Sequence, residues 1–153
     1  MKKGLAVAVA LILLFSAIAY LANSREKQGT PQFPSAEMVL DRSVYSVGDS
    51  LTLTIINDGN EPLLVGAFYR LYRFENGKWK SISTGITVTG IGYQIGPGQN
   101  WSQTIPLMVA RNGKLEPLPP GRYRIEKTVI IDRGRCGRGS DEITLSAEFE
   151  VVG

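Results

Sequence analysis

Histidine is absent from the 153 residues of this chain. It is the side chain most often used as a general base and the commonest metal ligand, so neither role can be filled by histidine here. A glycine-rich nucleotide-binding motif is also missing. We therefore expect a protein that is not an enzyme, has no catalytic residues and needs no metal or cofactor.

Cysteine occurs once, as Cys136. A single cysteine cannot close an internal disulfide, so the chain is not a disulfide-stapled scaffold. In an exported protein, a lone thiol either pairs with another molecule or has no role. The sequence leaves these two alternatives open.

An excess of charge of one sign is also lacking. Two of the 17 basic residues, Lys2 and Lys3, belong to an N-terminal stretch, residues 1–24, that contains no acid. The rest of the chain carries 15 basic and 14 acidic residues, without a long run of either sign. This balance does not give the cationic surface of a nucleic-acid-binding protein, and we expect no nucleic-acid partner.

Residues 1–24 are predicted to be a signal peptide or an N-terminal membrane anchor. Two lysines precede an uncharged, mainly aliphatic stretch at residues 4–22, which would span about 28 Å as a helix. Ala17 and Ala19 fit a cleavage site, whereas the length of the stretch fits an uncleaved anchor with the lysines in the cytoplasm. Either alternative places the domain outside the cytoplasm, as a secreted or a membrane-anchored module.

Residues 25–35 are predicted to be a linker because they are polar and rich in glycine and proline. Residues 36–153 have the ordinary length of one β-sandwich. Apolar and polar residues alternate strictly over residues 143–151, as in a strand with one buried face. Gln103 and Pro106 indicate an edge strand. We expect seven or eight strands, at about 37–41, 50–57, 64–75, 78–83, 86–90, 100–107, 122–131 and 142–152.

Asn76 and Gly77 form the preferred pair for a two-residue type I′ turn. A turn at this pair places Glu75 opposite Lys78 and their neighbours Phe74 and Trp79 opposite each other. An opposite-charge pair and an aromatic pair both stabilise antiparallel strands, which supports the register independently. Asn76, Gly77 and Trp79 are therefore predicted to have structural roles.

Three further segments carry motifs of a known kind. Residues 44–55 combine Tyr45, a Gly-Asp turn and a threonine-rich strand that Asn57 closes; residues 95–99 form a glycine-proline turn; and residues 118–125 lead from a proline-rich corner into a strand. Together with the 76–79 hairpin, they resemble the bacterial immunoglobulin-like domain family over roughly residues 36–152. The resemblance implies an all-β, immunoglobulin-like β-sandwich, here preceded by an N-terminal hydrophobic helix.

The same resemblance implies a structural role for Tyr123. In immunoglobulin folds a tyrosine near the start of the penultimate strand bonds back to upstream backbone and fixes a corner. Ile125 takes the position of the second cysteine of an antibody domain. Plain packing would then replace the disulfide.

The loop at residues 132–142 is the most unusual segment and connects the last two predicted strands. It contains three glycines together with Arg133, Arg135, Cys136 and Arg138. Arginine suits bidentate contact with carboxylate or phosphate, and a cationic neighbourhood makes a thiol more reactive. These four residues are the predicted partner-binding site; the alternative is a solvated loop kept soluble by its arginines.

Acidic residues flank this loop, and a sequon precedes one strand. Asp132, Asp141 and Glu142 either form a weak calcium site or neutralise the arginines. Asn100 begins an Asn-Trp-Ser glycosylation sequon, whose occupancy the sequence does not decide.

Two features of the predicted strands also have alternative interpretations. Five aromatic residues near the hairpin form a binding platform or belong to the core and cross-strand packing; they are Phe68, Tyr69, Tyr72, Phe74 and Trp79. Lys127 interrupts an apolar alternation, which indicates a β-bulge or a lysine that reaches the edge of a sheet.

The predicted function is that of a non-catalytic cell-envelope binding or structural module, with the 132–142 loop as its contact surface. Its partner would be an envelope protein or a glycan, and an uncleaved leader would add the membrane through residues 4–22. The alternative is an inhibitor of an extracytoplasmic protease that acts through an exposed loop.

Overall fold

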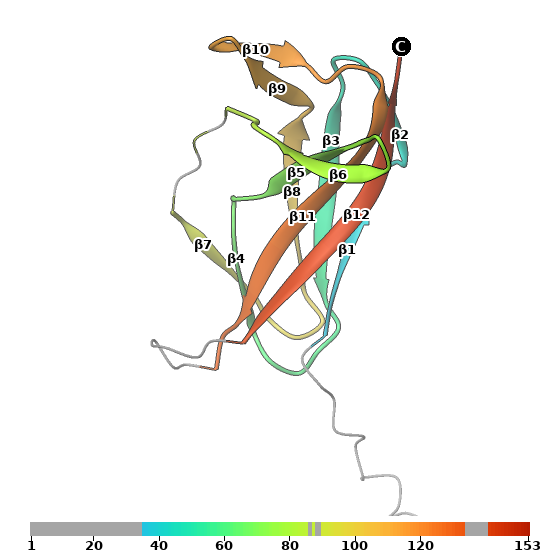
Figure 1. Cartoon of the computed structure of the whole chain (residues 1–153). Coiled ribbons are helices and arrows are strands. Elements are labelled where there is room, and N and C mark those ends of the chain that lie inside the picture. Colours follow the sequence, from blue (N-terminus) through green and yellow to red (C-terminus); the bar gives the residue numbers. More distant parts are fainter. Residues whose placement is uncertain (1–34, 86, 88–89, 134–140) are drawn as a thin grey trace, which may run out of the picture. The chain divides into compact units, whose positions relative to one another are not determined.

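The computed structural model describes residues 35–85, 87, 90–133 and 141–153 (Figure 1). The chain divides into two units, Met1–Gln32 and Phe33–Gly153. The predicted leader at 1–24 lies outside the described residues, as does the predicted linker apart from Ser35. Within the described residues, no helix is long and apolar enough to cross a membrane.

The described residues are all-β and form a three-stranded sheet, a seven-stranded sheet and a separate hairpin. The first sheet has the order β1 (Ala36–Leu40), β3 (Ser50–Asn57), β8 (Asn100–Pro106). The second sheet contains, in order, β2 (Val44–Ser46), β12 (Glu142–Val152), β11 (Gly121–Ile131), β4 (Leu63–Gly66) and β7 (Gly92–Ile95). In the same sheet β5 (Arg70–Glu75) also pairs with β11, and β6 (Lys78–Ile82) pairs with β5. The hairpin pairs β9 (Met108–Arg111) with β10 (Lys114–Pro117).

The core lies between the two larger sheets, because alternate residues of each strand point inward. On β3 the inward residues are Leu51, Leu53 and Ile55, and all three are fully buried. On β11 they include Ile125, at the position where an antibody domain would have its second cysteine. The predicted all-β sandwich is therefore confirmed, and packing fills this position of the core.

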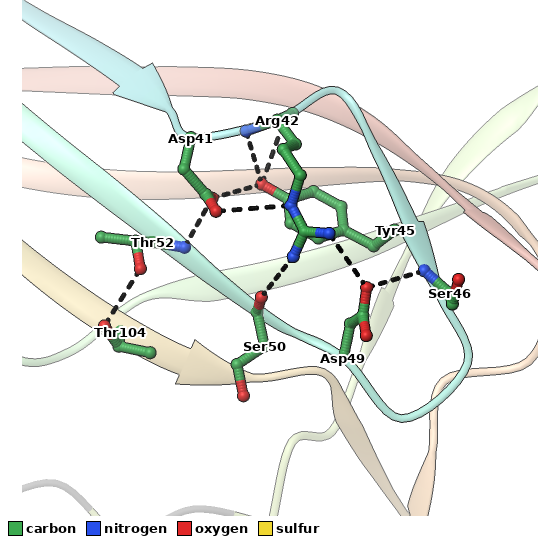
Figure 2. A network of polar contacts seen from close by, with 8 residues as sticks. All are labelled: Asp41, Arg42, Tyr45, Ser46, Asp49, Ser50, Thr52 and Thr104. Carbon is green, nitrogen blue, oxygen red and sulfur yellow. Dashed lines mark hydrogen bonds and ion pairs between the residues drawn. The ribbon is translucent and has the colours of Figure 1, made fainter.

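The chain changes sheets between β1 and β2, and a polar network fixes the corner (Figure 2). The Tyr45 hydroxyl lies 2.7 Å from Asp41 Oδ1 and 2.8 Å from the Arg42 carbonyl oxygen, and these two acceptors share its one proton. Asp41 Oδ1 also accepts the backbone N–H of Thr52 on β3 at 2.8 Å. After this corner β2 pairs in parallel with β12. The chain thereby connects β1, in the three-stranded sheet, to the seven-stranded sheet.

The predicted hairpin is confirmed in its register, with Glu75 opposite Lys78 and the two aromatic neighbours opposite each other. Asn76 and Gly77 have φ values of 51° and 76°, as a type I′ turn requires. The ion pair differs from the expected one, however. The Glu75 carboxylate contacts Lys80 Nζ at 3.2 Å and Arg73 Nη1 at 3.3 Å.

Several strand predictions were wrong, and the described residues form twelve strands instead of seven or eight. The strand expected at 64–75 is broken at 67–69, between β4 and β5. The strand expected at 86–90 lies partly outside the described residues, and its described positions 87 and 90 are not in a strand; β7 follows at Gly92–Ile95. β2 and the β9–β10 hairpin were not predicted.

The sandwich has two ends, which we call proximal and distal. Ser35, where the described chain begins, lies at the proximal end with Asn57 and Asp132, since Ser35 and Asp132 bond to the turn that follows β3. The β9–β10 hairpin and the C-terminus lie at the opposite, distal end (Figure 1). The described residues at the two ends of the 132–142 loop, Asp132 and Asp141, therefore lie at the proximal end.

Candidate functional site

The two ends of the predicted binding loop, residues 131–133 and Asp141, form what we call its neck. Side-chain and backbone contacts hold these two ends together. Arg133 Nη1 lies 2.5 Å from Asp141 Oδ2, and both side chains are about half exposed. Gln94 Nε2 donates to Asp132 Oδ2 at 2.8 Å, which ties the neck to β7. The Ile131 N–H also donates to the Asp141 carbonyl at 2.9 Å. Arg135, Cys136 and Arg138 lie outside the described residues.

These contacts bear on the calcium alternative at the same loop. The carboxylates of Asp132 and Asp141 already accept from Gln94 and Arg133. Among the residues that the structure describes, no group of three or more acidic or cysteine residues is placed to hold a metal ion. Asp132 and Asp141 therefore each hold a neighbouring donor in place.

Asn57 organises the proximal end from a fully buried position. Its Nδ2 donates to the carbonyls of Ile95 and Glu61, each at 2.9 Å, and its Oδ1 accepts the N–H of Gly59 at 3.0 Å. One amide thus satisfies backbone groups of the turn after β3 and of the strand end at β7. This explains physically why an asparagine closes the threonine-rich strand.

Tyr123 fixes the distal end in the way that the resemblance implied. Its hydroxyl donates to the Pro119 carbonyl at 2.6 Å, four residues upstream. Arg73 braces the same corner, since its Nη2 donates to the Pro120 carbonyl at 3.0 Å. Gly121 has a φ of 155°, and a Cβ there would lie 3.2 Å from Arg73 Nε, so glycine lets the guanidinium lie against the corner.

A pocket of about 220 Å³ opens at this distal end. It lies between the β5–β6 hairpin, the β9–β10 hairpin and the corner before β11. Its walls combine apolar and charged side chains, contributed by Arg73, Glu75, Ile82, Ser83, Val109, Ala110, Arg111, Leu118, Pro119 and Tyr123.

The aromatic residues near the hairpin do not form one platform. Tyr69 is buried, whereas Phe68 is 58% exposed in the break between β4 and β5. Phe74 and Trp79 pack with ring centroids 5.1 Å apart, as cross-strand partners. The guanidinium of Arg124 lies 4.3 Å from the Trp79 ring, so the protein's own arginine covers this aromatic surface.

Arg122 and Arg124 on β11 continue this outer surface of the seven-stranded sheet. Both donate to Glu148 on β12, at 2.5 Å and 2.8 Å. These hydrogen bonds, first from Arg124 and then from Arg122, lower the pKa of Glu148. The charges of this surface are thus paired with one another.

The structure contradicts both predictions for Lys127, a β-bulge and a side chain that reaches the edge of a sheet. The β11–β12 pairing runs through Lys127 without a bulge, and the side chain is 1% exposed inside the sandwich. Its Nζ donates to the carbonyls of Gly66 at 2.6 Å and Phe68 at 3.1 Å, and to Gln103 Oε1 at 2.9 Å. It also lies 4.8 Å from the Trp101 ring. Burial lowers the pKa of Lys127 to about 8.

The lysine and Gln103 together explain the break between β4 and β5. The break turns carbonyl groups away from the β11 ladder, and a buried carbonyl needs a donor. Lys127 supplies donors to two of them, and Gln103 Nε2 donates to the Ala67 carbonyl at 3.0 Å. β8 is an edge strand of its sheet, as Gln103 and Pro106 indicated.

Sequence reasoning missed the distal pocket, although part of its signal was present. Asn112 and Gly113 form a second Asn-Gly pair, between the apolar residues Val109 and Leu115. They have φ values of 49° and 74° and make the β9–β10 turn. The presence of both Arg73 and Arg111 in the lining of one pocket has no local signature in the sequence.

Comparison with known proteins gives one family match. The family model described as "Bacterial Ig-like domain" matches residues 32–150 of the chain. No curated protein matches it.

Similar solved structures resemble the chain only weakly. The structural-genomics target SoR45 is 17% identical over 80% of this chain and 87% of that chain, with a TM-score of 0.44. A β-glucosidase from Listeria innocua, in complex with gluconolactone, is 16% identical over 79% of this chain, with a TM-score of 0.35. The DNA glycosylase AlkC from Pseudomonas fluorescens is 20% identical over 78% of this chain, also with a TM-score of 0.35. The matches span 16% of the β-glucosidase chain and 31% of the glycosylase chain, and they carry no argument about function.

Proposed function

The chain belongs to the bacterial Ig-like domain family, and from this premise we propose that it is a non-catalytic binding module displayed outside the cytoplasm. Domains of this family are generally non-catalytic and typically surface-exposed. We propose the 132–142 loop as the contact surface, with Arg133, Arg135, Cys136 and Arg138 as the residues that meet an envelope protein or a glycan.

The neck of the loop is the observation that carries this proposal. The loop connects β11 and β12, each of eleven residues, and the Arg133–Asp141 pair joins its two sides. A loop on such a stem is presented by a rigid scaffold, as binding loops commonly are. Arg133 is about half exposed, and arginine is suited to carboxylate or phosphate groups on a partner.

The position of the neck favours a partner in the same envelope layer. Ser35 and the neck lie at the same end of the sandwich (Figure 1). The predicted linker at residues 25–35 spans at most about 40 Å when fully extended. An anchored domain would therefore keep this loop within reach of components near the membrane.

The buried polar residues support binding over catalysis. Among the described residues, the buried polar or charged side chains are Asn57 and Lys127. Both make internal hydrogen bonds, to backbone carbonyls and to Gln103. A catalytic group has to reach its substrate, and neither of these buried side chains is exposed to solvent.

The test is a pull-down from native membranes with the tagged full chain, under reducing and non-reducing conditions. The loop variant replaces Arg133, Arg135 and Cys136 with serine, and a control replaces Lys78 and Lys114 at the two distal turns. We expect a partner that the wild type and the control capture and the loop variant does not. Equal capture by all three proteins, or none by any, would show that the loop is not the contact surface.

Protease inhibition is the second candidate, because a loop on a rigid stem also suits insertion into an active site. Incubation with a panel of extracytoplasmic proteases tests it directly. Inhibition by the wild type that the loop variant loses would support this function. Unchanged activity of every protease would exclude it for the enzymes tested.

A further inference from the structure

Independently of the loop, we propose that the distal pocket binds a small monocarboxylate with a short apolar body. The pocket is the 220 Å³ space between the β5–β6 hairpin, the β9–β10 hairpin and the corner before β11. The carboxylate can belong to either of two kinds of molecule, a free acid or the C-terminal end of a peptide chain. The β9–β10 hairpin, which contributes lining residues, lies at the end of the sandwich opposite the end of β11 and the start of β12 that border the 132–142 loop (Figure 1).

Arg73 provides a guanidinium that is already held in position. Its Nη2 donates to the Pro120 carbonyl at 3.0 Å, and its Nη1 contacts Glu75 Oε1 at 3.3 Å. Its Cζ lies 5.9 Å from the centre of the Tyr123 ring. A side chain fixed from several directions loses little conformational freedom when a ligand arrives, which favours binding.

Arg111 provides the second guanidinium, which has no carboxylate partner among the described residues. It lines the pocket from the end of β9, where its backbone belongs to the β9–β10 ladder. Within the part of the chain that the structure describes, its guanidinium makes no hydrogen bond or ion pair with another side chain. Burial raises the pKa of Tyr123, and the positive charges of Arg73 and Arg111 act against that shift. Arg73, Arg111 and Tyr123 all line this one pocket.

The charge of the lining selects for a single negative group. Two arginines and one glutamate line the pocket, so its formal charge is +1. One ligand carboxylate balances this charge, and guanidinium groups bind carboxylates through directed, charge-assisted hydrogen bonds. Glu75 disfavours a second negative group on the same ligand through like-charge repulsion.

The remaining walls and the volume define the body of the ligand. Val109 and Leu118 are buried core residues that also line the pocket, and Ile82 lies beside them. A volume of 220 Å³ corresponds to about seven water molecules, which is small for a ligand site. The pocket therefore suits a branched short-chain acid or one terminal residue of a peptide.

The pocket depends on an element that lies outside the two main sheets. The β9–β10 hairpin forms its own two-stranded sheet, and Ala110 N–H joins it to the Ser83 carbonyl at 2.9 Å. This bond places Arg111 across from the β5–β6 hairpin that carries Arg73. The hairpin thus completes a site that the core strands alone would leave open.

The experiment titrates the full chain with 3-methylbutanoate, with 3-methylbutanamide and with N-acetylvaline, while amide chemical shifts are recorded. The amide has the same apolar body without the charge, and N-acetylvaline represents a peptide end. The test variant is Arg111→Gln. Its matched control is Lys114→Gln, which removes one positive charge from the same hairpin outside the pocket lining.

We expect saturable shifts at the residues lining the pocket with a carboxylate and none with the amide. Arg111→Gln should weaken binding at least tenfold, and Lys114→Gln less than twofold. Tighter binding of N-acetylvaline assigns the site to peptide ends, and tighter binding of 3-methylbutanoate assigns it to free acids. Equal binding of acid and amide, no saturable shift with either acid, or no effect of Arg111→Gln would overturn the proposal.

Discussion

The two ends of the sandwich differ in how they are held and in how visible they are in the sequence. The distal end is fixed by two tyrosine hydroxyls, those of Tyr45 and Tyr123, and by Arg73 against the corner before β11. The proximal end depends on one buried amide, Asn57, and on exposed pairs at the neck of the loop.

One end contains an unusual run of residues in the sequence, whereas the other contains a site assembled from residues that are distant in sequence. The proximal loop attracts attention because arginines and a cysteine follow one another along the chain. The distal pocket combines residues from three separate segments, and none of these segments is unusual by itself. A site that is made of neighbours in space leaves little trace in a linear pattern.

Replacing Asn57 should have the largest effect on this comparison. Asn57→Ala removes three hydrogen bonds and leaves buried backbone groups without partners, so we expect the free energy of unfolding to fall by about 3 kcal/mol. Urea unfolding measures the loss. Asn60→Ala, at an exposed position in the same turn, is the control and should change stability by less than about 0.5 kcal/mol. Equal effects of the two changes would contradict a special role for Asn57.

Lys127, which is buried between the two ends, should make the free energy of unfolding depend on pH. Its folded pKa of about 8 lies below the unfolded value of 10.5, so the unfolded chain binds more protons between these values. Stability should therefore rise with pH in this window, by about 2 kcal/mol between pH 7 and about pH 9.5. Denaturant unfolding of wild type and Lys127→Met across this range measures the difference. A wild type whose stability changes in parallel with that of Lys127→Met would show that the lysine does not titrate in this way.

Replacing Tyr123 should cause the next largest loss of stability. Tyr123→Phe keeps the ring in the core and removes the hydrogen bond to the Pro119 carbonyl, so we expect a loss of about 1–1.5 kcal/mol. Thermal or urea unfolding measures it. Tyr93→Phe, at a 43% exposed position, serves as the control and should be nearly neutral. A neutral Tyr123→Phe would mean that the distal end does not depend on this hydroxyl.

The neck of the loop should show the smallest effect. Arg133→Ser breaks an exposed ion pair, and such pairs contribute little, so the expected loss is below about 0.5 kcal/mol. Raised salt should reduce even this difference, because salt screens exposed charges. A loss above 2 kcal/mol in the same unfolding assay would mean that the neck supports the fold and does not only present the loop.

Local patterns predicted much of the sheet structure. Strict alternation marked β12, and the first Asn-Gly pair fixed the register of the β5–β6 hairpin. Both signals act between near neighbours in sequence, where turn geometry and side-chain alternation are dictated by the backbone itself. The second Asn-Gly pair, at Asn112, carried the same information for the β9–β10 hairpin and was overlooked.

The role of Lys127 could not be predicted in this way. Its partners Gly66 and Gln103 are 61 and 24 residues away along the chain. In sequence it only disturbs an apolar alternation, which is equally typical of a bulge or an edge. The ammonium is accommodated because a break in another strand and a glutamine from the opposite sheet meet it in the core.

The sequence by itself determined the class of the domain, most strand positions, one hairpin register and the corner tyrosine, because these follow from alternation, turn chemistry and motif. Tertiary structure decided where the chain breaks between β4 and β5, which groups bond to the Lys127 ammonium, and that Arg73 and Arg111 line one pocket. The physical reason is that these features depend on which carbonyls and charges meet across the core and at the ends. Such encounters are set by sheet pairing over long separations in sequence, and local residue patterns do not record them.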